Sequence, residues 1–214
     1  MDQDQVWQAI DTQRSTVARL LESLHDSDWE RPSLCADWTV RDVAAHLTLQ
    51  QVGPLDAVRM MVTAPGGMKR TIRESARKQA AKLSAAQIVA EIGGMVGSRR
   101  HNVGVTYQET LIDILVHSQD ISWPLGGELS VPPQAASVAM ARVWNSGWPF
   151  RAKKRLRGLQ LSATDSAWSA GDGPEIRGTS GVLLLLLTGR QAALPLLAGD
   201  GIAVLRERLA AGAR

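Results

Sequence analysis

The chain has 214 residues, of which 44% are hydrophobic and 21% charged, and its formal net charge is +3. This apolar fraction can fill a core, so the composition excludes a largely disordered chain. The small, dispersed net charge gives no indication of nucleic-acid binding. Cys35 is the single cysteine, which excludes an intramolecular disulfide and a cysteine-rich zinc site.

The sequence contains no recognisable membrane or export signal. Its beginning is polar and acidic, unlike a secretory signal peptide. The longest apolar run, residues 182–187, is far shorter than the ~20 residues that cross a bilayer. We therefore expect a soluble, cytoplasmic protein with no membrane and no nucleic-acid partner.

Helical periodicity dominates the first two thirds of the chain. Apolar residues recur at helical spacing over about residues 3–25. Thr39, with Asp42 at the reciprocal capping position, predicts the start of a second helix that ends before Pro65. Residues 70–81 are polar but compatible with a helix. Other capping signals predict three more helices, over about residues 84–96, 106–122 and 132–145.

The pattern changes after Pro149. Alternating apolar residues and glycine-rich turns predict short strands near residues 159–163, 167–168 and 175–177. A nearly all-apolar stretch over residues 181–190 predicts a buried helix, and a last helix follows Gly199. We therefore expect two domains, a helical one over residues 1–150 and a small α+β one over residues 151–214.

A basic run lies at this expected boundary, with five Lys or Arg residues between Arg151 and Arg157. The favoured interpretation is a solvated linker, and an anion-binding patch is the alternative. Nucleic-acid binding by this run would depend steeply on salt concentration. The absence of aromatic residues within the run argues against that function.

Two stretches carry residues suited to metal binding. His46 lies on the second predicted helix, and His117 lies on the helix over residues 106–122, four residues after Asp113. A carboxylate and an imidazole at this spacing share one helical face and can converge on one cation. A histidine from a facing helix would complete a set of three ligands and leave positions open for water or substrate.

Each of these residues also has a structural interpretation. An isolated histidine beside an apolar stripe is commonly a core residue, and an Asp–His pair is commonly a surface interaction. Asp120, three residues after His117, could orient that histidine instead of binding the ion. His25 suits the end of the first helix, and His101 lies in a loop beside arginines, so neither receives a role.

Two sequence motifs resemble those of a known family. The segment PSLCADWTVRDVAAHL over residues 32–47 and the segment LIDILVHSQDI over residues 111–121 resemble the two signatures of the mycothiol-dependent maleylpyruvate isomerase family. The C-terminal stretch, from Thr164 to Gly201, resembles the small α+β domain of that family. The similarity therefore extends over nearly the whole chain.

The resemblance implies a mainly α fold, in which a DinB-like four-helix bundle is followed by a small α+β domain. It also implies that His46, Asp113 and His117 bind a divalent metal, with Zn²⁺ favoured and Ni²⁺ or Fe²⁺ as alternatives. The family usually has Glu at the position of Asp113, so the side chain that carries the carboxylate is one methylene shorter in this chain.

The function implied by the resemblance is that of a metal- and mycothiol-dependent enzyme. Metal coordination would stabilise the thiolate of mycothiol, and the thiol would act on a small electrophile, acidic substrates included, in an isomerase or S-transferase reaction. Arg190 is the candidate for binding a substrate carboxylate, and capping of a helix C-terminus is its alternative role. A non-catalytic metal-binding or regulatory protein of the same fold is the alternative function.

Three side chains in or near the first motif remain. Cys35 could be a metal or redox thiol, but a buried structural position is favoured. Trp29 and Trp38 are interpreted as packing anchors. We expect the site itself in a cleft between the two domains.

Overall fold

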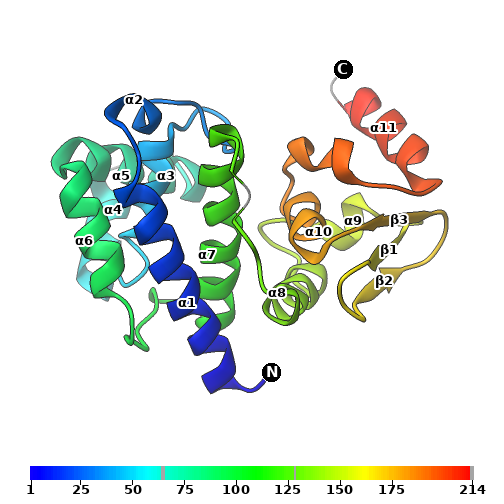
Figure 1. Ribbon diagram of the computed structural model, residues 1–214, viewed down its shortest axis with the longest axis horizontal. Coiled ribbons are helices and arrows are strands. Elements are labelled where there is room, and N and C mark those ends of the chain that lie inside the picture. Colours follow the sequence, from blue (N-terminus) through cyan, green and yellow to red (C-terminus); the bar gives the residue numbers. More distant parts are fainter. Residues whose placement is uncertain (64–65, 128, 213–214) are drawn as a thin grey trace. The chain divides into compact units, whose positions relative to one another are not determined.

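The computed structural model of the protein describes residues 1–63, 66–127 and 129–212 (Figure 1). The fold is mainly α with one small sheet in the C-terminal part, which confirms the predicted fold class. The chain divides into two compact units, Asp2–Leu129 and Ser130–Arg214. Within the described residues, no helix combines the length and the hydropathy needed to cross a bilayer.

The first unit is built of helices around one core. In chain order they are α1 (Gln3–Glu22), α2 (Asp26–Trp29), α3 (Val40–Leu47), α4 (Pro54–Thr63), α5 (Met68–Lys82), α6 (Ala85–Gly94) and α7 (Tyr107–Ser122), followed by the 3-10 turn η1 (Trp123–Leu125). Helix α1 packs against α6 and α7, while α3 packs against α5 and α7 (Figure 1). Their facing apolar side chains are buried, for example Ile10, Val43, Ile92 and Leu115.

Side-chain caps set the beginnings of the two helices that carry the predicted ligands. The Thr39 hydroxyl accepts from the backbone N–H of Asp42, and the Asp42 carboxylate accepts from that of Thr39. Thr106 and Glu109 form the same reciprocal pair at the start of α7. Because these caps fix the first turn, they determine which face of α3 and α7 each later residue occupies.

The second predicted helix is interrupted. It was expected to run unbroken from Thr39 to about residue 62, but α3 ends at Leu47 and α4 begins at Pro54. Proline has no backbone N–H and suits the first turn of a new helix, so the Gly53–Pro54 step separates the two. The turn between them contains Gln50, which is buried. Pro65, where the helix was expected to stop, lies outside the described residues.

The second unit combines helices with a small sheet. Its elements are α8 (Pro133–Asn145), α9 (Ala152–Arg155), β1 (Gln160–Ala163), β2 (Ser169–Gly171), β3 (Glu175–Gly178), α10 (Ser180–Leu187), the 3-10 helix η2 (Gln191–Leu196) and α11 (Gly201–Gly212). The strand order is β2-β1-β3, antiparallel between β1 and β2 and parallel between β1 and β3. Every residue of α10 is buried, as its apolar sequence predicts.

The division between the units falls earlier than the boundary predicted after residue 150. Helix α8 was expected to belong to the helical domain, but it packs on α10 in the second unit. Its buried face is largely alanine, which allows close approach of the two helices. The basic run is likewise part of the second unit, because Arg155 donates to the carbonyls of Leu186 and Leu187 at the end of α10.

We expect Gly199→Ala to lower the free energy of unfolding by about 2–3 kcal/mol. Gly199 has φ +107°, and an added Cβ would lie 2.2 Å from the carbonyl oxygen of Glu175. Urea denaturation measures the change. Gly147→Ala is the matched control, because nothing lies within 4 Å of its added carbon, and it should cost less than about 1 kcal/mol. Equal losses in the two variants would contradict this account.

Candidate metal centre

Helices α3 and α7 bring the three predicted ligands together. Nε2 of His46 lies 3.2 Å from Oδ1 of Asp113, and Nε2 of His117 lies 3.3 Å from the same oxygen. The three potential ligand atoms all lie within 4.8 Å of one another. The spacing of Asp113 and His117 aligns them on one face of α7, and the packing of α3 on α7 adds His46 from the facing helix.

This donor set fits a divalent cation with open coordination positions. Two imidazole nitrogens and one carboxylate oxygen are ligands that zinc and related ions accept. Within the part of the chain that the structure describes, no fourth His, Cys, Asp or Glu joins the group. The side chains of His46, Asp113 and His117 are 17%, 28% and 12% exposed, so a small molecule can reach them.

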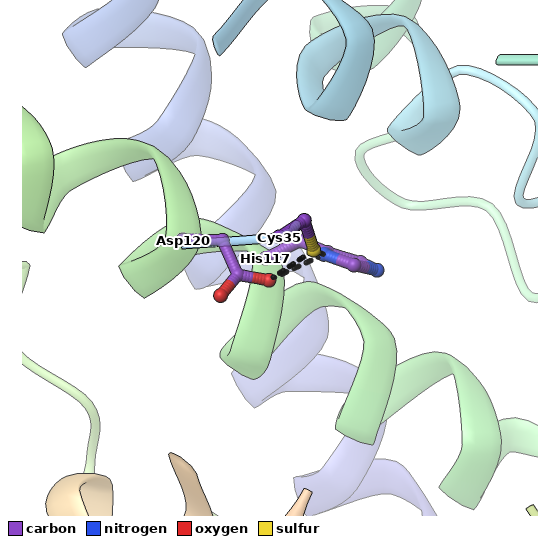
Figure 2. A group of neighbouring side chains, drawn as sticks. All are labelled: Cys35, His117 and Asp120. Atoms are coloured by element: carbon purple, nitrogen blue, oxygen red, sulfur yellow. Dashed lines mark hydrogen bonds and ion pairs between the residues drawn. The ribbon is translucent and has the colours of Figure 1, made fainter. Parts of the chain in front are cut away.

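A second carboxylate lies on the far side of the His117 ring. Oδ2 of the fully buried Asp120 is 2.8 Å from Nδ1 of His117, and the Cys35 thiol donates to the same oxygen at 3.1 Å. Figure 2 shows these three side chains converging. A carboxylate at Nδ1 holds a proton there and leaves the lone pair of Nε2 for a metal. Asp120 therefore has the geometry of the orienting role considered from the sequence.

Cys35 differs from its favoured interpretation as a buried structural residue. It is half-buried, and its sulfur lies 3.8 Å from Nδ1 of His117. Cys35, His117 and Asp120 could themselves hold an ion, on the ring nitrogen opposite the first group. The backbone N–H of Leu34 donates to the carbonyl of Asp120 at 3.1 Å, and this bond holds the loop before α3 against α7.

Trp38 lies against both imidazoles. Its ring stacks on His117, with 6.3 Å between ring centroids and 8° between planes, and meets the edge of His46 at 5.3 Å. The sequence predicts Trp38 as a packing anchor. In the structure, the groups that it packs against are two of the predicted metal ligands. Its ring therefore covers the two histidines on one side and restricts how they turn.

Two residues near the ligands, Gln50 and Arg14, were not predicted from the sequence. The Gln50 side chain donates from Nε2 to Oδ2 of Asp113 at 2.8 Å, and its Oε1 accepts from the guanidinium of Arg14. One signal was available, because Gln50 follows His46 by four residues and would share its face if the helix predicted from Thr39 ran unbroken. No comparable signal marks Arg14, whose contacts depend on the packing of α1.

Arg190 belongs to the second unit, at the start of η2. Its Nη1 donates to the backbone carbonyl of Thr188 at 3.0 Å, directly after α10. This contact fits the capping role weighed as the alternative. Arg190 also lines a cavity of about 460 Å³ together with Arg155 and Arg208, so its side chain borders space in which an anion could bind.

The histidines determine the ionisation of Asp113. Burial disfavours its negative charge, but the charges of His46 and His117 outweigh burial and hold the pKa of Asp113 well below its usual range. Burial also opposes the charge of His117, yet the Asp113 carboxylate, followed by Cys35, raises the pKa of His117 well above its usual value. Without a metal, the cluster is thus held together by a carboxylate and an imidazolium.

We expect the metal-free protein to lose stability as the pH rises above about 6.5, the pKa of an unperturbed histidine. The unfolded chain releases the His117 proton there, whereas the folded chain retains it up to its raised pKa. Urea denaturation in the presence of a chelator, between about pH 6 and about pH 9, measures this dependence. His117→Asn should flatten the curve in that range and His101→Asn should not. An unchanged slope in the first variant would contradict the assignment.

The chain is similar to known proteins in two respects: part of its sequence matches a family model, and its fold matches solved structures. Residues 10–104 match the family model described as the mycothiol maleylpyruvate isomerase N-terminal domain. No curated protein matches the chain. Crystal structures of the mycothiol-dependent maleylpyruvate isomerase and of a mutant of it are similar, with TM-scores of 0.59 and 0.58. Each is 12% identical, over 94% of this chain and 93% of that chain.

At this identity the likeness to solved structures shows a shared fold and nothing more. The family model supports the resemblance in sequence, because the matched residues include the first motif and His46. Asp113 and His117 lie beyond that range and are supported by their geometry. Residues 10–104 are therefore similar to the N-terminal domain of the mycothiol maleylpyruvate isomerase family, in agreement with the resemblance of the first motif.

Proposed function

We propose that the protein is a metal- and mycothiol-dependent enzyme, an isomerase or S-transferase that acts on small electrophiles. The observation that carries the proposal is the convergence of His46, Asp113 and His117 at a partly exposed site. The family of the N-terminal domain supports a thiol cosubstrate. The exposure of the three side chains favours an enzyme over a non-catalytic metal protein, whose ion is typically enclosed by a fourth ligand.

The residues around the site have distinct roles in this proposal. His46, Asp113 and His117 would hold the cation, for which Zn²⁺ is the first candidate. The bound cation would supply positive charge that lowers the pKa of a thiol beside it. Asp120 keeps a proton on Nδ1 of His117, so that Nε2 faces the ion. Trp38 shields both imidazoles from water on one side.

The substrate is expected to be a small electrophile, with acidic compounds among the candidates. In an isomerase the thiol would add to an electrophilic double bond and later be eliminated, whereas in an S-transferase it would displace a leaving group. Arg190 would bind a substrate carboxylate through two parallel hydrogen bonds. Its position on a cavity that also contains Arg155 and Arg208 supports an anion as the ligand.

The first test of this proposal is metal content. Purified protein should carry roughly one divalent cation per chain, and His117→Ala should weaken Zn²⁺ binding by more than about 100-fold, because a direct ligand is lost. Elemental analysis and competition with a chromophoric chelator measure the two quantities. His101→Ala alters an exposed histidine outside the cluster and should keep its metal. Full occupancy in His117→Ala would remove this residue from the site.

The second test concerns Arg190. Arg190→Ala should lower the turnover of an anionic substrate by about 10–100-fold and leave the metal content unchanged. Isomerisation of maleylpyruvate in the presence of mycothiol is the assay. Arg206→Ala is the control, because Arg206 is exposed on α11 and does not line this cavity, and it should retain activity. A joint fall of metal content and activity in Arg190→Ala would assign Arg190 a structural role.

A further inference from the structure

Arg14 is a completely buried cation near the middle of α1. Its Nη1 donates to the carbonyls of Met95 and Ser98, just after α6, at 2.9 and 3.4 Å. Its Nε and Nη2 donate to Oε1 of Gln50 at 3.3 and 3.2 Å. Asp11, one turn earlier, lies 3.6 Å away and compensates its charge. With its donors directed at these groups, the guanidinium has little freedom to move.

The guanidinium determines the orientation of the Gln50 amide. It has donors only, so the amide atom that faces it must be the oxygen. The amide nitrogen must then point to the opposite side, where it lies 2.8 Å from Oδ2 of Asp113. A flipped amide would direct its N–H groups at a cation and its oxygen at a carboxylate, and both contacts would be repulsive.

The two oxygens of Asp113 consequently have different partners. Oδ2 accepts from Gln50, while Oδ1 lies 3.2 and 3.3 Å from the Nε2 atoms of His46 and His117. A carboxylate with one oxygen engaged in this way cannot rotate without breaking a partly buried hydrogen bond. The arrangement reserves a single oxygen for the position between the imidazoles.

We infer that Gln50, oriented by Arg14, is a positioning residue that makes Asp113 present Oδ1 alone to the metal. This inference rests on the proposed metal-binding function and extends it to a residue that touches no ion. It links α1, the turn after α3 and α7 into one support for the ligand. Hydrogen bonds to metal-binding carboxylates generally orient the ligand and strengthen binding.

Cobalt(II) is the probe for the test, because its visible absorption reports the number and geometry of its ligands. Gln50→Met keeps the length of the side chain and removes its hydrogen bonds. We expect it to weaken Co²⁺ binding by about 10–100-fold and to change the spectrum of the bound ion. Gln50→Asn, which is too short to span from Arg14 to Asp113, should have the same effect and serves if the first variant does not fold.

Gln13→Met is the matched control. Gln13 is also buried, lies on α1 and donates to the Ser118 hydroxyl on α7 at 2.8 Å, but has no hydrogen bond to Asp113. This variant should lose a comparable helix–helix contact and keep the affinity and spectrum of the wild type. A wild-type spectrum and affinity in Gln50→Met would overturn the inference, as would equal changes in Gln50→Met and Gln13→Met.

A measurement without metal separates this inference from the proposed function. Urea midpoints are compared for metal-free wild type, Gln50→Met, Asp113→Asn and the double variant. If Gln50 holds Asp113, the two single shifts should not add up to the shift of the double variant. Additive shifts would overturn the inference. Failure of the wild type to bind Co²⁺ would instead overturn the proposed function. The comparison of the single variants with the double variant would still decide the role of Gln50.

Discussion

The carboxylate of Asp113, set between two imidazoles, is the interaction on which the candidate site depends. A charged group in this position needs compensation, which the protonated His117 provides in the metal-free protein and a cation would provide in its place. The same need for compensating charge therefore explains why the three side chains converge and why the cluster suits a metal. It also explains why the surrounding groups are arranged to limit the freedom of each ligand.

Each ligand is held by a neighbouring side chain. Asp113 accepts from Gln50, His117 faces Asp120, and Trp38 packs on the rings of both histidines. These partners come from the loop before α3, the turn after it and α7 itself, so helix packing and side-chain hydrogen bonds act on the same few atoms. Such support is what a site needs if its ligands are to keep one geometry during a reaction.

The second unit shows where local patterns are insufficient. Its strands and its apolar helix lie close to where alternation and composition predict them. Helix α8 was predicted correctly as a helix but assigned to the wrong side of the boundary, because an alanine-rich face can pack on either neighbour. The basic run was interpreted as a linker, since its sequence does not reveal that Arg155 reaches the carbonyl end of α10.

By itself the sequence determined the features that depend on neighbouring residues. The caps at Thr39 and Thr106, the four-residue spacing of Asp113 and His117, and the family motif all act within a few turns of the chain. Only the tertiary structure decided which groups support the ligands. Gln50 meets Arg14 across 36 residues and Asp113 across 63, and Cys35 meets Asp120 across 85. No periodicity encodes such contacts, because they exist only after the helices have packed around a common core.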